Sequence, residues 1–190
     1  MKLSKDFKEI KGDASFRKFY RNIKKNSIIV FANKEKPKNL LIYDSINKIL
    51  IRNNIIAPKL LSQNYENNYI EIQDLGNKTI YQIFLKNKKN QYSIFKKIIE
   101  VLNKIQLIKD KKIKNFKNIF YKIEDYKNKI IFDEAKLFSY WYIPKKLNKK
   151  KIRIFNVKFS KEIKQLLSKL NLKNDTFVHR DFHVSNLVVN

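Results

Sequence analysis

Short apolar stretches, some of them alternating with polar residues, dominate the first part of the chain. Ser27–Phe31 is almost wholly apolar and β-branched, and alternation continues through Asn68–Leu75, so both stretches are predicted to be strands. The polar and aromatic residues 11–22 are expected to pair with 27–32 as a hairpin that turns near residues 24–26. Helical spacing of apolar residues predicts the helices of this part, at 3–10 and 40–53.

Beyond Gly76 the apolar spacing changes to the helical period of about 3.6 residues. This period predicts helices at 79–85, 92–107, 118–126, 132–147 and 160–170. Lysine-rich connectors are expected at 86–91 and 148–159, and residues 176–190 return to a β-like pattern. The chain is therefore predicted to be an α+β protein in which a β-rich part precedes a mainly helical part, with a boundary near Gly76.

Length and composition restrict the class of protein further. With 190 residues, 43% of them hydrophobic, the chain suffices for one moderate domain or two small lobes. It has no cysteine, which excludes disulfides and thiolate metal sites. It lacks a run of about 18 apolar residues, and residues 1–10 lack the apolar core of a secretory signal. We expect a cytoplasmic protein with no membrane insertion.

The charge of +26 is extreme, and a nucleic-acid or other anionic partner is one interpretation of it. Nearly all of this charge is lysine, spread between apolar helix positions where a solvated face belongs. We therefore expect no specific nucleic-acid partner, but a general attraction to anionic ligands. The chain has only two glycines, which excludes a G-x-G-x-x-G loop and a Walker A loop.

The strongest chemical signal is the segment His179-Arg180-Asp181-Phe182-His183-Val184-Ser185-Asn186. Phosphoryl transfer from Mg-ATP needs a carboxylate beside the acceptor hydroxyl and oxygen ligands for the metal. The H-x-D-x-x-x-x-N spacing is that of a kinase catalytic loop, with Asp181 as the base and Asn186 as the metal ligand. His179 is expected to hold the loop backbone. A zinc site formed by His179, Asp181 and His183 and a plain surface turn are the alternatives.

The chain resembles the aminoglycoside phosphotransferase/choline kinase superfamily, and within it the bacterial anomeric kinases of N-acetylmuramate and N-acetylglucosamine. Four blocks carry the resemblance, at 12–21, 73–76, 138–142 and 177–187. The resemblance implies a protein-kinase-like two-lobed fold. Its parts would be an N-lobe at 1–73, a hinge at 74–77 and an incomplete C-lobe at 78–190. It also implies a monomeric, ATP- and Mg²⁺-dependent transferase acting on a small-molecule hydroxyl, namely that of an amino sugar.

The resemblance also implies roles for individual residues. Those expected to bind the nucleotide are Ser15, Phe16, Arg17, Gln73, Asp74 and Leu75. Those expected to contact the acceptor are Arg180, His183 and Trp141. Alternatives remain: an exposed strand face for Arg17, a plain turn for 74–77, and core packing for the aromatic block 138–142.

Two departures from the family pattern affect the expected activity. The strand at 28–31 has no phosphate-binding lysine, and Lys34 is a weak substitute. The second metal carboxylate of the family would follow Asn186, but the sequence ends at Asn190. We expect a chain that is complete at its N-terminus, truncated at its C-terminus, and weakly active or inactive as it stands. The functional alternatives are a kinase for choline, an aminoglycoside or a homoserine-like amine, and a non-catalytic basic nucleic-acid-binding protein.

Overall fold

The structure is a computed structural model that describes residues 6–10, 17–32, 37–86, 91–171 and 176–189. The described residues form an α+β protein with five α-helices, a five-stranded antiparallel sheet and a separate two-stranded hairpin. The chain divides into one unit of residues 1–123 with 179–190 and a second unit of residues 124–178. The predicted lobes at 1–73 and 78–190 remain a prediction. None of the described helices is both long and apolar enough to cross a bilayer.

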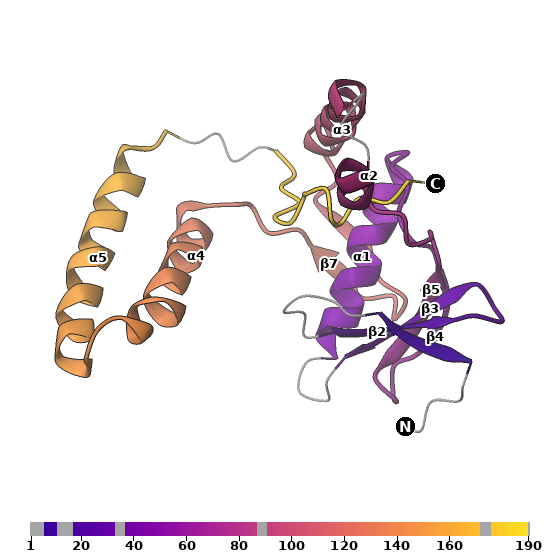
Figure 1. The fold of residues 1–190 in the computed structure, drawn as a ribbon, viewed down its shortest axis with the longest axis horizontal. Helices are drawn as coiled ribbons and strands as arrows, with labels where there is room; N and C mark the ends of the chain where they lie inside the picture. The colour runs from indigo at the N-terminus through magenta and orange to yellow at the C-terminus, as the bar shows by residue number, and fades with distance from the viewer. Residues whose placement is uncertain (1–5, 11–16, 33–36, 87–90, 172–175, 190) are drawn as a thin grey trace. The chain divides into compact units, whose positions relative to one another are not determined.

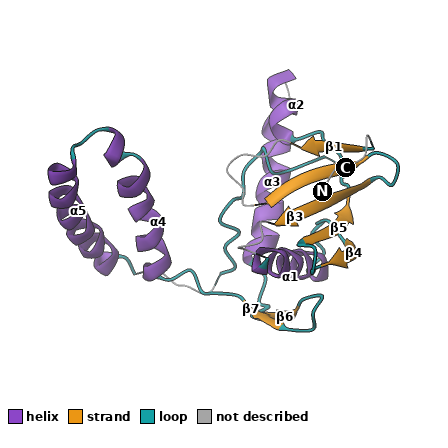
Figure 2. Ribbon diagram, turned by 90° about the horizontal axis from the view of Figure 1, so that it is seen from below, coloured by secondary structure: helices purple, strands orange, loops and turns teal. Residues whose placement is uncertain are grey.

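The larger unit is built on the five-stranded sheet (Figures 1 and 2). Its strands are β1 (Phe7–Ile10), β2 (Arg17–Asn22), β3 (Ser27–Ala32), β4 (Leu60–Asn64) and β5 (Tyr69–Gln73), in the order β1-β2-β3-β5-β4. The predicted hairpin is confirmed for residues 17–32, because Asn22 pairs with Ser27 across a turn in which Asn26 has a φ of 49°. Residues 11–16 of that prediction lie outside the described residues. The predicted strand at 68–75 is confirmed as β5.

The helix predicted at 3–10 is wrong, because Phe7–Ile10 forms the edge strand β1. This strand pairs antiparallel with β2, and Phe7 lies opposite Asn22. An isolated helix of this length is unstable in water, whereas the strand gains backbone hydrogen bonds from a partner about a dozen residues away. No local pattern in the sequence could report that partner.

Helix α1 (Lys38–Arg52) confirms the helix predicted at 40–53, and it packs against the sheet through β3. Leu40 of the helix is fully buried with Val30 and Ile70, which lie opposite each other on β3 and β5. Burying side chains of this kind stabilises a fold by about 1.5–3 kcal/mol each. The core therefore holds β3 against β5. Residues 74–77 follow directly after the C-terminal end of β5.

Helices α2 (Ile80–Lys86) and α3 (Gln91–Gln106) confirm the helices predicted at 79–85 and 92–107. The helix predicted at 118–126 is wrong, because β6 (Lys112–Lys114) and β7 (Phe120–Lys122) form a hairpin there. The Asn115 side chain accepts hydrogen bonds from the backbone N–H groups of Lys117 and Ile119, at 2.9 and 3.2 Å. Such local bonds stabilise a turn in competition with a helix.

The second unit is a helical hairpin of α4 (Asn128–Trp141) and α5 (Lys149–Lys169). The helix predicted at 132–147 is interrupted after Trp141 by a short 3₁₀ turn, η1 (Ile143–Lys145), because Pro144 cannot continue an α-helix. The connector predicted at 148–159 is wrong. Asn148 caps α5 by accepting from the Lys151 N–H at 3.0 Å, and Phe155 and Phe159 of that helix stack 5.4 Å apart.

Candidate active site

The loop at 179–189 lies along the first turn of α2, where the C-terminal segment passes beside that helix in Figure 1. The backbone contacts are Ile80 N–H to Leu187 O at 2.9 Å, Tyr81 N–H to Val184 O at 3.1 Å, and Val189 N–H to Lys78 O at 3.0 Å. The first N–H groups of a helix lack partners within it, and the loop supplies acceptors for two of them. The β-like pattern of 176–190 amounts to one isolated bridge, between Thr79 and Val188.

Three polar side chains of this loop converge. The side-chain Nδ2 of Asn186 donates to the Asp181 carboxylate at 2.7 Å and to its main-chain oxygen at 3.1 Å. His183 Nε2 lies 3.2 Å from the other Asp181 carboxylate oxygen and 3.1 Å from Asn186 Nδ2. Because the amide nitrogen of Asn186 faces Asp181, its carbonyl oxygen Oδ1 remains an acceptor. The predicted catalytic and metal-binding residues are therefore adjacent, with an oxygen left to receive a cation.

The hydrogen bonds of His183 fix its orientation. Its Nδ1 accepts from the Ser185 backbone N–H at 3.3 Å, so a neutral ring carries its proton on Nε2. That proton faces Asp181 Oδ1. The Asp181 side chain is 73% exposed, which leaves lone pairs of the carboxylate accessible to another hydroxyl. His183 can thus hold Asp181 while the carboxylate receives a ligand.

Arg180 has a φ of +67°, a left-handed conformation that costs a non-glycine residue about 1–2 kcal/mol. Such a conformation persists where surrounding contacts hold it, and it occurs often at functional sites. The bonds between this loop and α2 are contacts of that kind. Arg180 is exposed at the start of the loop.

His179 is packed inside the loop, with its ring edge-on to Phe182 at 5.9 Å. Burial lowers the pKa of His179; the nearby Asp181 charge opposes this effect and His183 adds to it. Its Nδ1 is buried without a hydrogen-bond partner among the described residues. Within those same residues no three histidine, aspartate or glutamate side chains are grouped to hold a metal ion, so the zinc alternative lacks its ligand set.

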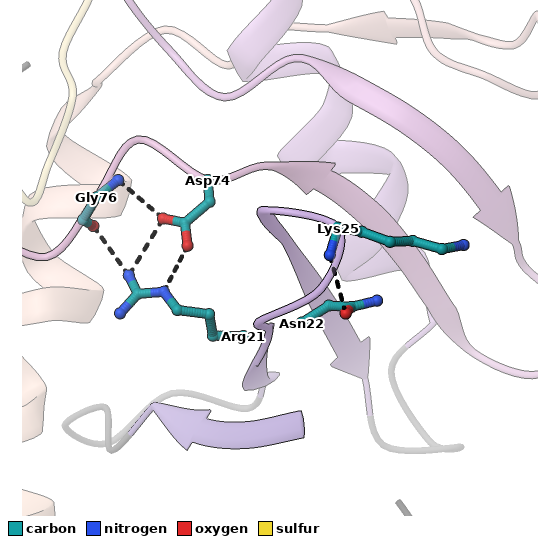
Figure 3. A network of polar contacts seen from close by, with 5 residues as sticks. All are labelled: Arg21, Asn22, Lys25, Asp74 and Gly76. Carbon is teal, nitrogen blue, oxygen red and sulfur yellow. Dashed lines mark hydrogen bonds and ion pairs between the residues drawn. The ribbon is translucent and has the colours of Figure 1, made fainter. Parts of the chain in front are cut away.

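The segment predicted as the hinge is held by a partly buried ion pair between Arg21 and Asp74 (Figure 3). Arg21 of β2 donates through Nε to Asp74 Oδ2, and through Nη2 to Asp74 Oδ1 and Gly76 O, both at 3.1 Å. The Gly76 N–H donates to Asp74 at 2.8 Å. Gly76 has a φ of +93°, which only glycine adopts without strain. The Asp74 carboxylate, 3% exposed, is therefore occupied by the turn itself.

The side chain of Asp74 is bonded within this turn, whereas part of the neighbouring backbone is not. The Gln73 N–H donates to Lys59 O at 2.9 Å and so belongs to the sheet. The backbone N–H and C=O of the half-buried Leu75 have no hydrogen-bond partner among the described residues. Leu75 therefore has one backbone donor and one backbone acceptor that no other described residue uses.

The ion pair between Arg21 and Asp74 was not predicted from the sequence, although both residues lie in blocks of the resemblance. They are 53 positions apart, and neither helical nor strand periodicity links them. A turn bond beside Arg21 stiffens the same end of the β2–β3 hairpin, because the Lys25 N–H donates to Asn22 Oδ1 at 3.3 Å (Figure 3).

The other predicted site residues lie apart from this loop or outside the described residues. Ser15, Phe16 and the weak candidate Lys34 belong to the latter group. Arg17 begins β2, with its guanidinium 4.8 Å from the centre of the Tyr43 ring of α1. Trp141 ends α4 in the second unit and is 73% exposed.

The aromatic side chains of residues 138–142 differ in how far they pack against other rings. Phe138 stacks on Tyr142 at 5.1 Å and contacts Phe159 at 5.8 Å, but it is 46% exposed and does not belong to a buried core. Trp141 has a still more exposed ring. Core packing of the block and the role of Trp141 both remain predictions.

No family model matches the chain, and no curated protein matches it significantly.

Proposed function

We propose that this chain carries the catalytic loop of a small-molecule kinase that moves the γ-phosphate of ATP to a hydroxyl group. The observation that supports the proposal best is the arrangement of Asp181 and Asn186, whose side chains are hydrogen-bonded at 2.7 Å. The amide nitrogen of Asn186 is used by Asp181, and its carbonyl oxygen is left for a hard cation. A carboxylate and a cation ligand held together in this way are what phosphoryl transfer requires.

The residues of the loop have separate tasks in this reaction. ATP would supply the phosphoryl group, and Mg²⁺ held by Asn186 would offset the negative charge of the phosphate oxygens. Asp181 orients the acceptor hydroxyl and takes its proton as the new P–O bond forms and the bond from the γ-phosphorus to the bridging oxygen breaks, which releases ADP. His183 holds the second carboxylate oxygen at 3.2 Å and so limits rotation of Asp181. Asn186 Oδ1 fits Mg²⁺ because it is a neutral oxygen donor beside a carboxylate.

The nucleotide is proposed to bind beside residues 73–75. Leu75 has an unpaired backbone donor and acceptor among the described residues, and the bonds between 78–81 and the loop bring this segment close to the loop. Arg21 fixes Asp74, so the backbone at Leu75 is held before a ligand arrives. Arg17 stays a candidate for phosphate contacts, together with Ser15 and Phe16 outside the described residues.

The fold proposed for the whole protein is protein-kinase-like and two-lobed, with an amino sugar as the acceptor. Both parts of this proposal rest on the sequence resemblance. Arg180 and His183 add donors beside Asp181 that suit a hydroxylated or acidic sugar. Trp141 stays a candidate for the acceptor on the resemblance alone.

The test is Asp181→Asn in the longest natural form of the protein that contains these residues. ATP, Mg²⁺ and either N-acetylglucosamine or N-acetylmuramate are supplied, and ³¹P NMR follows the sugar phosphate. Transfer is expected to fall by about 10²–10⁴-fold while ATP binding is retained. Undiminished transfer by Asp181→Asn contradicts the assignment. RNA binding with a steep salt dependence, and no ATP binding, favours the nucleic-acid-binding alternative.

A further inference from the structure

Helix α1 and the β6–β7 hairpin lie beside each other in the larger unit (Figure 2). A pocket of about 440 Å³ opens there, within the size range of small-molecule sites. It shares no residue with the loop at 179–189 or with the segment 73–81. Four of its lining residues are cations, and no acidic side chain lines it: Lys48 and Arg52 come from α1, and Lys112 and Lys114 from β6.

The two cations of α1 are already compensated. Lys48 Nζ lies 2.8 Å from the buried carboxylate of Asp44. Arg52 donates to Asp110 at 3.3 Å, and Asp110 also accepts from the Asn53 side chain at 2.6 Å. These two pairs contribute no net charge to the pocket, so its sign depends on the hairpin.

The two cations of β6 are not compensated. In the described part of the chain neither Lys112 nor Lys114 pairs with a carboxylate. Their ammonium groups lie 5.3 and 5.2 Å from the centre of the Phe120 ring. The electron-rich face of a ring attracts a cation, but it does not neutralise the charge. The pocket thus carries about two uncompensated positive charges.

These lysines are expected to lower the stability of the β6–β7 hairpin. Residues two apart on a strand share a face, so Lys112 and Lys114 project on the same side. Lys122 lies directly opposite Lys112 across the two strands. Like charges in opposite positions destabilise a strand pair, and a hairpin with three residues in each strand is weak by itself. A bound anion would reduce this repulsion between the lysines and would therefore stabilise the hairpin.

The rest of the pocket is apolar. Ile51 of α1, the buried Ile113 of β6 and the ring of Phe120 line it beside the cations. Phe120 is 58% exposed, so its ring has surface left to cover. An inorganic anion alone would leave the exposed face of the Phe120 ring in contact with water. The lining matches a ligand with a doubly charged end and an apolar or aromatic body.

We propose that this pocket binds a small phosphate monoester, with its phosphate between Lys112 and Lys114 and its organic group against Phe120 and Ile51. A phosphate monoester has a second pKa near 6 and is therefore close to a dianion at pH 7. Its charge equals the excess charge of the pocket, and each lysine donates a charge-assisted hydrogen bond. The proposal is independent of the kinase assignment, because the two sites share no residue.

The experiment is a titration of the full ¹⁵N-labelled chain with phenyl phosphate, followed by NMR. We expect amide shifts to concentrate at 48–52, 112–114 and 120, while the amides of 179–189 stay unchanged. Inorganic phosphate, which lacks the ring, and benzoate, which has the ring but a single charge, are both expected to bind at least about fivefold more weakly. Shifts confined to 179–189, or equal affinity for all three ligands, contradict the proposal.

The matched variants are Lys114→Gln and, as the control, Lys122→Gln. Both remove one positive charge from the same hairpin, but only Lys114 lines the pocket. Lys114→Gln is expected to weaken phenyl phosphate binding about fivefold, which corresponds to about 1 kcal/mol, and Lys122→Gln less than about twofold. An equal effect of the two variants means diffuse attraction to the charged surface and overturns the site.

A last comparison separates the sources of the phosphate. Adenosine 5′-monophosphate and a short 5′-phosphorylated RNA carry the same monoester group. We expect the two to shift the amides of 48–52, 112–114 and 120 with similar affinity, because one monoester fills the pocket. Additional shifts at 73–75 with adenosine 5′-monophosphate report the separate proposed nucleotide site. If the RNA binds far more tightly and shifts amides across other lysine-rich surfaces, the hairpin belongs to a nucleic-acid interface and the small-ligand proposal is wrong.

Discussion

The side-chain nitrogen of Asn186 lies 2.7 Å from the carboxylate of Asp181, across five positions of one loop. This contact links the proposed base to the proposed metal ligand. It also determines which end of the amide is available, since the nitrogen is used and the oxygen is not. The pair is therefore a single unit, and a change in either residue is expected to alter both tasks.

Replacing Asn186 tests that coupling. Asn186→Ala removes the oxygen proposed for Mg²⁺ and frees the Asp181 carboxylate to rotate, so we predict a loss of phosphate transfer of about 10²-fold or more. The measurement is the initial rate of ADP release at increasing Mg²⁺ concentrations. Ser185→Ala is the matched control, because only the backbone N–H of Ser185 bonds within the loop. Equal losses in the two variants would point to general damage of the loop.

The ion pair between Arg21 and Asp74 is predicted to stabilise the larger unit. Arg21→Ala leaves the Asp74 carboxylate, 3% exposed, without its cation, which typically costs about 3–5 kcal/mol. Urea denaturation of the single variants and of the double variant with Asp74→Ala measures the coupling, expected above about 1 kcal/mol. The exposed pair of Lys24 and Asp6 is the control, and Lys24→Ala is expected to cost less than about 1 kcal/mol.

The features that the sequence predicted correctly depend on residues that are close together along the chain. Asp181 and Asn186 are five positions apart, so their pairing follows from one loop, and α1, α2 and α3 follow from the spacing of their own apolar residues. Arg21 and Asp74 are 53 positions apart, and no local pattern joins them. Their contact depends on the order of strands in the sheet, which was not predicted.

Two of the wrong predictions have a different, local origin. Apolar residues at 118–126 have helical spacing, but the Asn115 side chain makes two bonds that close a turn instead. Asn148 is a preferred residue type at a helix N-cap, but the lysines that follow it are more typical of an exposed connector. In both segments a short polar side chain that bonds to the backbone determines the local structure. The spacing of apolar residues does not report such bonds.

The pKa of His179 predicts how stability depends on pH. Burial keeps this pKa below the unfolded value of about 6.5, so the unfolded chain binds the proton more readily. Stability is present in full above pH 6.5 and is lost as the pH falls from there through the lower folded pKa. The chain has only two histidines, which simplifies the assignment.

Urea denaturation midpoints between pH 7.5 and pH 5 measure this effect. His179→Leu is expected to remove most of the loss between about pH 6.5 and pH 5, because the group that titrates there is gone. His183→Gln is the control: His183 is exposed, and its replacement is expected to leave the loss in place. A loss that disappears in His183→Gln and persists in His179→Leu contradicts the prediction.

The cap of α5 is predicted to decide the stability of the second unit. Its first turn carries Lys149, Lys150 and Lys151, and positive charges at a helix N-terminus are unfavourable. The Asn148 side chain offsets this by accepting from the Lys151 N–H, so Asn148→Ala is expected to cost about 1 kcal/mol. Asn148→Asp keeps the acceptor and adds a negative charge beside the lysines, so it should be at least as stable as the natural residue.

The single tryptophan of the chain, Trp141, ends α4 and reports on this unit alone. Its fluorescence during urea denaturation therefore separates unfolding of α4 and α5 from unfolding of the sheet. Lys150→Ala is the control, because it changes the same turn without touching the cap, and it is expected to be neutral or slightly stabilising. If Asn148→Ala and Asn148→Asp shift the midpoint equally, removal of the amide explains the effect and the cap does not.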